Sequence, residues 1–443
     1  MSTPRNAVTR TARLAALPLG YAGRSALGIG KRIGGAPAEA VLTELQQRTA
    51  EQLFRTLGEL KGGAMKLGQA MSIFEAALPE DVAAPYRDHL TRLQDSAPPM
   101  PTITVREILA RELGADYATH LTDLDAEPAA AASIGQVHRA RWDGRDVAVK
   151  VQYPGAGDAL RNDLRQLARV ARGIGPAFPG IDVKPLIEEL QERVEEELDY
   201  HLEAEAQRVF AAEYAVDRDI VVPGVVAGTA QVLVTDWLES PASLAQVIRD
   251  GSRAERDHYG ELFVRFLLGA PSRTGMLHAD PHPGNFRLLP TRAGKPGRLG
   301  VLDYGAVARL PERRLPDSLG SLIRLACLGD YDQLVEALRA GGFIKDRIQV
   351  DADQLRTYLD PFVEPVRAET FTFSRSWMQD QFRRVNDPRG DSYRVMMRLN
   401  LPPAYLLIHR TWVGGIGVLS QLNATVPFRT ILQESLPGFA DPR

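Results

Sequence analysis

The sequence predicts an α+β fold in which a small β-rich lobe is followed by a larger helical lobe. Two observations carry this prediction. The segments VHRARW and DVAVKVQ flank Asp143-Gly144, a dipeptide that favours a two-residue turn with positive φ, so a β-hairpin is expected from about Gln136 to Gln152. From Arg253 onward the apolar residues recur mostly with helical spacing, interrupted by a loop at 277–285 and a short strand ending at Leu302.

The second strand of the hairpin has two faces. Side chains alternate along a strand, so Val147, Val149 and Val151 are expected on one face and Lys150 on the other. Lys150 therefore faces whatever the hairpin covers.

Helices are expected before and after this hairpin. Residues 39–76 have a helical apolar period interrupted by Gly62-Gly63, which predicts two helices and a bend. Thr104 and Glu107 have the spacing of a capping box and predict a helix that runs to about Leu113. The Glu- and Leu-rich segment 185–214 predicts one long helix.

A further strand pair is expected after that long helix, at 220–222 and 231–237. Both segments are apolar and short, as strands are, and the stretch between them contains proline and glycine. They complete the β-rich lobe in this prediction.

Length and composition limit the possible functions. With 443 residues, 44% hydrophobic and 25% charged, the chain is an ordinary globular protein with room for two lobes and extensions. The single cysteine, Cys327, excludes an internal disulfide and a cysteine-rich zinc site, and favours a reducing compartment. The net charge of -3 and the lack of a basic patch interleaved with aromatics argue against nucleic acid as a partner.

Residues 1–38 contain no Asp or Glu but are basic, through Arg5, Arg10, Arg13, Arg24, Lys31 and Arg32. Three interpretations compete: a flexible basic tail, an organelle transit peptide, and a helix lying on an anionic membrane surface. We favour a flexible or surface-associated segment. No run of 18 or more apolar residues occurs in the sequence, so the chain is not expected to span a bilayer.

The first chemical pattern is the strand VAVK, which ends at Lys150. A phosphate-binding lysine in mid-strand needs a carboxylate to hold its ammonium group, and that partner usually comes from a neighbouring helix. The segment 185–214 offers many carboxylates. Taken alone, the pattern is more typical of an apolar strand with one solvated lysine.

The second pattern is HADPHPGN at 278–285. Asp280 and Asn285 have the spacing of a kinase catalytic loop, in which the carboxylate lies near the attacking oxygen and the carboxamide oxygen binds magnesium. His278 takes the place of the histidine that packs and orients this loop. One alternative is a turn-rich loop with local hydrogen bonds. Another is a metal site formed by His278 and His282, which Pro281 disfavours because it prevents a regular helix there.

The third pattern is LDYG, Leu302 to Gly305, directly after a short apolar strand. An aspartate followed by an aromatic residue and glycine is typical of the position that binds the magnesium of the nucleotide in kinase-like folds. The order of the three patterns along the chain makes coincidence improbable, and it predicts that Asp303 shares a site with Lys150, Asp280 and Asn285.

These motifs resemble the UbiB (AarF-domain) family of atypical kinase-like proteins, over residues 39 to about 425. The resemblance implies a bilobal protein-kinase-like fold with a helical extension before it. The expected divisions are 1–38, the basic segment; 39–115, the extension; 116–240, the N-lobe with inserted helices; and 241–443, the helical C-lobe.

Further motifs of this family are present. The segment AAAASIGQV at 129–137 resembles the alanine-rich nucleotide loop, with Ala130, Ala131, Ala132 and Ser133 at the nucleotide. Alanines allow fewer backbone conformations than glycines, so this loop is expected to close less freely over phosphates and to restrain transfer. KLGQ at 66–69 resembles the family signature KxGQ, carried here by Lys66, Gly68 and Gln69.

The segment EELDYHLE resembles the ExD element, with Glu197 and Asp199, followed by Glu203 in the position that pairs with the strand lysine. The resemblance implies that Glu197 meets Lys66 across the site. Residues 234–238 resemble the hinge whose backbone holds adenine, which adds Asp236 and Leu238 to the nucleotide-binding residues.

The implied cofactors are ATP or ADP and Mg²⁺. Asn285 and Asp303 would hold the metal, while Asp280, Lys150 and Glu203 would be catalytic. The resemblance implies a magnesium-dependent ATPase or small-molecule kinase that supports quinone or isoprenoid lipid biosynthesis. A protein serine/threonine kinase and a non-catalytic nucleotide-binding scaffold are the alternatives.

The expected partners are a nucleotide, a lipid or quinone precursor and a membrane surface. Attachment to the membrane is expected to be peripheral, because no hydrophobic hairpin follows the kinase-like region. A cytoplasmic or peripheral membrane location is expected, or a mitochondrial one if residues 1–38 are a transit peptide.

Overall fold

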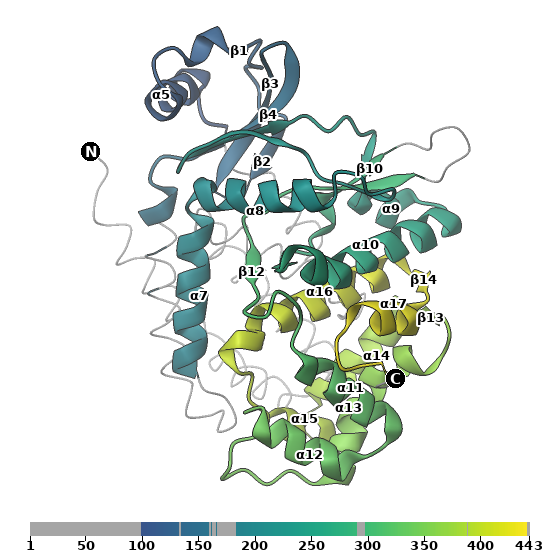
Figure 1. The fold of residues 1–443 in the computed structure, drawn as a ribbon. Helices are drawn as coiled ribbons and strands as arrows, with labels where there is room; N and C mark the ends of the chain where they lie inside the picture. Colours follow the sequence, from purple (N-terminus) through teal and green to yellow (C-terminus); the bar gives the residue numbers. More distant parts are fainter. Residues whose placement is uncertain are drawn as a thin grey trace, which may run out of the picture.

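The computed structural model describes residues 99–132, 134–158, 161, 165, 183–289, 297–387 and 389–440 (Figure 1). The expectations for the basic segment 1–38, the two helices at 39–76 and the KxGQ residues Lys66, Gly68 and Gln69 lie outside these residues, as does Ser133.

The first lobe is built on a curled antiparallel sheet in which the predicted hairpin is central. Its turn is formed by Asp143 (φ 48°) and Gly144 (φ 80°), as the sequence predicts. The strands follow the order β1-β3-β4-β7-β6, with β2 paired to β3: β1 Leu121–Thr122, β2 Ala130–Ala132, β3 Gly135–Trp142, β4 Arg145–Gln152, β6 Val225–Gly228 and β7 Val232–Asp236.

The predicted alternation along β4 is confirmed. Val147, Val149 and Val151 are fully buried and pack in one apolar cluster with α5 (Thr102–Leu113). Lys150 lies on the opposite face, toward α8 (Tyr200–Glu213), which runs beside the sheet (Figure 1).

Helix α5 ends where the sequence predicts, but the predicted capping box is wrong. The helix begins at Thr102 after Pro101, with no side-chain cap, so Thr104 already lies in the first turn. The start is set by burial of Val105, Ile108 and Leu109 against the sheet, which outweighs a local capping preference.

The single helix expected at 185–214 is two helices, α7 (Val183–Glu197) and α8. Asp199 is the N-cap of α8, and its carboxylate accepts a hydrogen bond of 2.9 Å from the His201 amide. A short polar side chain that captures backbone N–H groups ends one helix and starts the next.

The expected pair of strands after α8 is also wrong. Both strands exist, but β5 (Ile220–Val221) pairs in parallel with β11 (Arg298–Val301) in a second sheet, whereas β7 pairs with β4 and β6. Strand β6, which the sequence did not predict, is irregular, with a register shift between Val225 and Ala227. Long-range pairing of two-residue strands leaves no periodic signal.

The second lobe is mainly helical, with the second sheet in the order β5-β11-β10-β8 and two further strand pairs, β9 with β12 and β13 with β14 (Figure 1). Its remaining strands are β8 Ala242–Ser243, β9 Met276–His278, β10 Phe286–Leu289, β12 Val307–Arg309, β13 Phe371–Thr372 and β14 Thr425–Val426. Its helices are α9 Leu244–Asp250, α10 Arg253–Thr274, α11 Asp317–Leu328, α12 Tyr331–Ala340, α13 Ala352–Arg367, α14 Arg375–Asn386, α15 Asp391–Met396, α16 Leu406–Leu422 and α17 Phe428–Ser435.

The largest apolar core surrounds α10, whose buried Phe263, Phe266 and Leu267 contact residues of both neighbouring sheets and of α16 and α17. This core packs against the loop at 277–285 and fixes its position beside α10. In the part of the chain that the structure describes, no helix is both long and apolar enough to cross a membrane.

Candidate nucleotide site

Lys150 on β4 lies at the centre of the site. Its Nζ is 2.8 Å from both carboxylate oxygens of Glu203 on α8 and 3.3 Å from Oδ1 of Asp303, just after β11. The sequence predicted the partnership with Glu203 and the proximity of Asp303. Three residues from distant parts of the chain therefore meet at one ammonium group.

Burial makes these charges interdependent. The side chains of Glu203 and Lys150 are 3% and 14% exposed, and that of Asp303 is 34% exposed. Desolvation acts to lower the pKa of Lys150, but the carboxylates of Asp303 and Glu203 outweigh it and hold the pKa above its ordinary value. Burial raises the pKa of Glu203, and the ammonium group opposes this rise. The contact of Nζ with both oxygens of Glu203 therefore offsets part of the cost of burying this carboxyl group.

Tyr200 lies beneath this ion pair. The Lys150 ammonium is 4.9 Å from the centre of its ring, a distance at which a cation is attracted to the π-system. The Tyr200 side chain is buried, and its hydroxyl has no hydrogen-bond partner among the described residues. Together, Tyr200 and Glu203 fix the lysine from the α8 side.

The alanine-rich segment forms a short hairpin beside Lys150. Ala130–Ala132 make strand β2, which pairs with the start of β3 so that Ala131 lies opposite Gln136 and Ala132 opposite Gly135. Gly135 allows this hairpin to sit close to β4. A Cβ atom at Gly135 would lie 2.3 Å from the carbonyl oxygen of Val151 and 2.8 Å from the Tyr200 hydroxyl.

We therefore expect Gly135→Ala to destabilise the protein and to displace the nucleotide loop. Backbone atoms cannot move out of the way cheaply, so the expected loss of unfolding free energy is about 1–3 kcal/mol. Thermal and denaturant unfolding measure it. Gly269→Ala is the control, because the nearest atom to its Cβ lies 3.9 Å away; a loss of stability as large as that of Gly135→Ala would contradict this explanation.

Asp280 and Asn285 lie on the segment between β9 and β10. The side-chain nitrogen Nδ2 of Asn285 donates to Oδ2 of Asp280 at 3.0 Å, which leaves the side-chain oxygen of Asn285 for another partner. A guanidinium nitrogen of Arg410, on α16, lies 3.6 Å from Oδ1 of Asp280, whose side chain is 11% exposed. The backbone carbonyl of Asn285 accepts from the Leu302 amide at 2.8 Å, so this loop is hydrogen-bonded to the residue before Asp303.

His278 anchors the loop in the core, as the sequence predicts. It is fully buried, its ring packs edge-on against Tyr304 at 5.3 Å between ring centres, and Nε2 lies 3.0 Å from the carbonyl oxygen of Asp303. Burial lowers the pKa of His278, so the neutral ring donates from Nε2. Asp303 has a φ of 61°, a left-handed conformation that aspartate and asparagine tolerate better than most residues.

The expected hinge lies where β7 leaves the first sheet. The Trp237 amide donates to the Asp146 carbonyl at 3.0 Å, and Asp236 is 3.5 Å from a guanidinium nitrogen of Arg145. A Cβ atom at Gly300 would lie 2.2 Å from Leu238, so Leu238 packs against β11 of the other sheet. Leu238 thus contacts the second sheet, whereas Asp236 pairs within the first, and the contact of both residues with adenine stays a prediction.

The remaining expectations about this region concern Glu197, Asp199 and His282. Asp199 caps α8, and the meeting of Glu197 with Lys66 lies outside the described residues. His282 accepts from the Gly284 amide at 3.2 Å, and within the described ranges no three His, Cys, Asp or Glu side chains are grouped to hold a metal. Magnesium usually takes one or two carboxylates plus phosphates and water, so Asp303 and the Asn285 oxygen suit it without such a group.

Sequence reasoning missed three residues of the site: Gly135, Tyr200 and Arg410. A glycine at the start of a strand often marks a place where another backbone segment approaches closely, and this could have singled out Gly135. Tyr200 follows the N-cap Asp199, at a break within a segment whose sequence predicts one continuous helix. Arg410 gives no local signal at all, because only the packing of α16 brings it to Asp280.

Comparison with known proteins supports the same interpretation. The model of the ABC1 atypical kinase-like domain matches residues 92–338. The chain is 29% identical to Protein ACTIVITY OF BC1 COMPLEX KINASE 3, chloroplastic, of Arabidopsis thaliana, over 93% of this chain and 56% of that protein. It is 30% identical to Atypical kinase COQ8, mitochondrial, of Schizosaccharomyces pombe, over 93% of this chain and 66% of that protein.

A solved structure is also similar. It is titled "The complex structure of Rv3197-erythromycin from Mycobacterium tuberculosis", and it matches with a TM-score of 0.67 and 41% identity over 92% of this chain and all of that chain. The chain spans about half to two thirds of the length of the curated relatives named above. With the predicted bilobal kinase-like arrangement present and its domain model matched over more than half of the sequence, the chain belongs to the ABC1 (UbiB) family of atypical kinase-like proteins.

Proposed function

We propose that this protein is a magnesium-dependent ATPase or small-molecule kinase. The observation that carries the proposal is that the carboxylates of Glu203 and Asp303 lie within 3.3 Å of the Lys150 ammonium group. Next to them, a loop pairs Asp280 with Asn285. Phosphoryl transfer needs little covalent chemistry from a protein, but it does need fixed charges around the phosphates.

Each residue has one role in this proposal. Lys150, held by Glu203, contacts the phosphates, while Asp303 and the Asn285 oxygen hold Mg²⁺, which neutralises charge that develops on the transferred group. Asp280 accepts the proton of the attacking hydroxyl or water. The Arg410 guanidinium, 3.6 Å from Oδ1 of Asp280, orients that carboxylate.

ATP hydrolysis by the purified chain tests this proposal. We expect Mg²⁺-dependent release of phosphate that Asp280→Asn reduces by about 10²–10⁴-fold, the range that general base catalysis contributes, with nucleotide affinity little changed. Asp257→Asn, at a carboxylate of α10 that pairs with Arg253, is the matched control. Absence of hydrolysis in the wild type, with and without added acceptors, would contradict an enzymatic role.

The alanine-rich hairpin is the feature that would distinguish the proposed activity from that of a conventional protein kinase. We expect Ala131→Gly to loosen β2 and to raise phosphoryl transfer to the protein itself, since glycine adds backbone freedom where the nucleotide loop meets β3. Incorporation of labelled phosphate measures it, and Ala126→Gly, outside the hairpin, is the control. If Ala131→Gly leaves autophosphorylation unchanged, the loop does not restrain transfer.

The quinone or isoprenoid assignment rests on the family. Relatives carry the names of atypical kinases of mitochondria and chloroplasts, and a solved relative carries erythromycin in its title. We propose that this chain works with apolar small molecules and at a membrane surface. Hydrolysis measured with anionic liposomes and with quinone-like phenols tests this, because a protein kinase has no reason to respond to either.

A further inference from the structure

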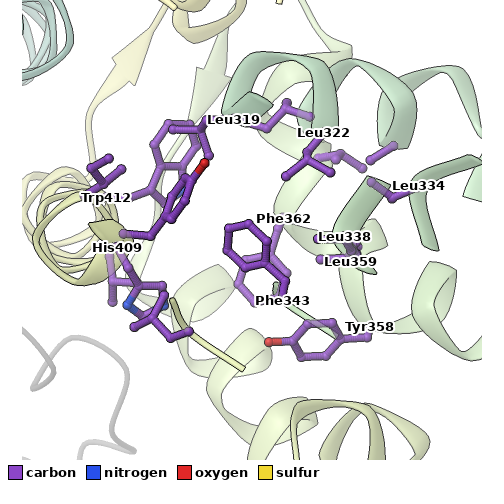
Figure 2. Close-up of a pocket in the computed structure, with 17 residues that line it drawn as sticks. Leu319, Leu322, Leu334, Leu338, Phe343, Tyr358, Leu359, Phe362, His409 and Trp412 are labelled. Carbon is purple, nitrogen blue, oxygen red and sulfur yellow. The ribbon is translucent and has the colours of Figure 1, made fainter. Parts of the chain in front are cut away.

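The loop at 277–285 contains a second histidine, His282, to which the proposed function gives no role. Other histidines of the helical lobe are explained by their surroundings. His278 is fully buried and anchors the loop in the core. His409 lines an apolar cavity of about 270 Å³ between α11, α12, α13 and α16, where Figure 2 shows its ring among aromatic and aliphatic side chains. His282 is only partly buried and belongs to neither setting.

The ring of His282 is held in one orientation. His282 is the N-cap of the short 3₁₀ helix η4 (Pro283–Asn285), and its Nδ1 accepts a hydrogen bond of 3.2 Å from the Gly284 amide. A Cβ atom at Gly284 would lie 3.0 Å from Nδ1 and 3.1 Å from Cε1, so any side chain there would press on the ring. Because Nδ1 accepts, it carries no proton, and the neutral ring has its N–H at Nε2.

Two carboxylates of the site act on this ring. Burial lowers the pKa of His282, and the charges of Asp280 and Asp303 oppose that fall. The ring therefore lies within electrostatic range of both the proposed base and the proposed metal ligand. In the part of the chain that the structure describes, Nε2 has no hydrogen-bond partner, so its N–H is available to a ligand.

Capping alone does not require a histidine at this position. Ser, Thr, Asp and Asn are the preferred N-cap residues, because one short oxygen acceptor satisfies the backbone. A histidine caps with one ring nitrogen and adds a donor on the other. The extra donor needs an explanation of its own.

The loop is tightly closed around the place where phosphoryl transfer is proposed. Nδ2 of Asn285 donates to Oδ2 of Asp280 at 3.0 Å, and the Asn285 amide donates to the His282 carbonyl at 3.0 Å. His282 is thus held within one turn of both residues. A phosphoryl group that passes to an acceptor at Asp280 comes within reach of this ring.

We propose that His282 is a further catalytic residue, whose Nε2–H donates a hydrogen bond to an equatorial oxygen of the phosphoryl group in transfer. This inference rests on the proposed function. In that step the acceptor oxygen bonds to the γ-phosphorus, and the bond from this phosphorus to the β–γ bridging oxygen breaks with its electron pair left on ADP. The proton of the acceptor passes to Asp280. His282 loses no proton, and its hydrogen bond stabilises negative charge on the transferred group.

The variant His282→Asn separates this role from capping. The side-chain oxygen of asparagine can accept from Gly284 as Nδ1 does, but no donor stands in the place of Nε2. We expect an unchanged melting temperature, an unchanged KM for ATP, and a kcat for hydrolysis lowered about 10²-fold, as on removal of one donor to developing negative charge. His120→Asn, the same substitution at an exposed histidine of the first lobe, is the matched control and should keep the wild-type kcat.

His282→Gln makes the opposite change. The side-chain N–H of glutamine can reach the position of Nε2, but its longer side chain suits the cap at Gly284 less well. We expect a lower melting temperature than that of His282→Asn and a higher kcat. Wild-type kcat in His282→Asn, or a folded His282→Gln with no higher kcat than His282→Asn, would overturn the role.

Binding of Mg-ADP with aluminium fluoride, which mimics the phosphoryl group in transfer, needs no turnover. We expect calorimetric titration to show binding of this complex to His282→Asn at least about tenfold weaker than to the wild type, the lower range of a hydrogen bond to a charged group. Binding of Mg-ADP alone should be equal. Equal affinities of both proteins for the fluoride complex would contradict the contact. If the expected difference is found but the wild type never hydrolyses ATP, the proposed function fails while the contact of His282 stands.

Discussion

Asp303→Asn is expected to abolish magnesium-dependent nucleotide binding. Loss of a group that merely supports a metal ligand costs about 10–100-fold in metal affinity, so loss of the carboxylate itself should weaken binding of Mg²⁺-ATP at least about 100-fold. Asparagine is the right replacement because Asp303 has a φ of 61°, a conformation that asparagine adopts readily. Calorimetric titration with and without Mg²⁺ measures the effect.

Asp123→Asn is the matched control for this variant. Asp123 is exposed and has a φ of 51°, so the same substitution is made in the same backbone conformation, away from Lys150. Its affinity for Mg²⁺-ATP should equal that of the wild type. Equal binding by the wild type and Asp303→Asn would contradict the assignment of Asp303 to the metal.

Lys150→Met is expected to have two large effects. Removal of charged hydrogen bonds to phosphate should lower nucleotide affinity by about 10- to 150-fold. The variant also leaves Glu203 buried without its cation, and breaking a buried ion pair from one side costs about 3–5 kcal/mol of unfolding free energy at neutral pH.

The loss of stability in Lys150→Met should depend on pH. Burial raises the pKa of Glu203 and the Lys150 ammonium opposes this rise, so in the folded Lys150→Met variant the carboxyl group keeps its proton at a pH where the unfolded chain has released it. Stability is fully present below the ordinary pKa of glutamate and is lost as the pH rises through the folded pKa. The melting temperature of Lys150→Met should thus fall from pH 5 to pH 8 relative to that of the wild type.

The double variant Lys150→Met/Glu203→Gln separates charge from packing. Glutamine does not titrate, so the additional pH dependence should disappear and part of the stability should return. If the single and double variants show the same pH profile, Glu203 is not the group that carries this stability.

The sequence correctly predicted the elements that are determined by interactions between residues close together in the chain. The hairpin around Asp143-Gly144 was predicted because turn chemistry and the alternation of valines act over a few residues. The proximity of Asp303 to Lys150 was predicted from three motifs whose order is informative, and the pairing of Lys150 with Glu203 from the family resemblance. The break at Asp199 was missed because the helical period on both sides outweighed a capping signal of one residue.

Features decided by long-range packing could not be predicted from the sequence. The two residues of β5 pair with β11 only because α8 returns the chain to the second sheet. Arg410 reaches Asp280, and the α11–α13 and α16 side chains enclose a cavity, through contacts between helices far apart in sequence. No short stretch of the sequence therefore indicates these contacts.

The position of the metal tests the account most directly. Crystals of the protein with Mn²⁺ and a non-hydrolysable ATP analogue should show an anomalous scattering peak within about 2.5 Å of carboxylate oxygen of Asp303 and carboxamide oxygen of Asn285, with Lys150 on the phosphates. A bound nucleotide whose manganese lies away from both residues would contradict the central claim that they hold its cation.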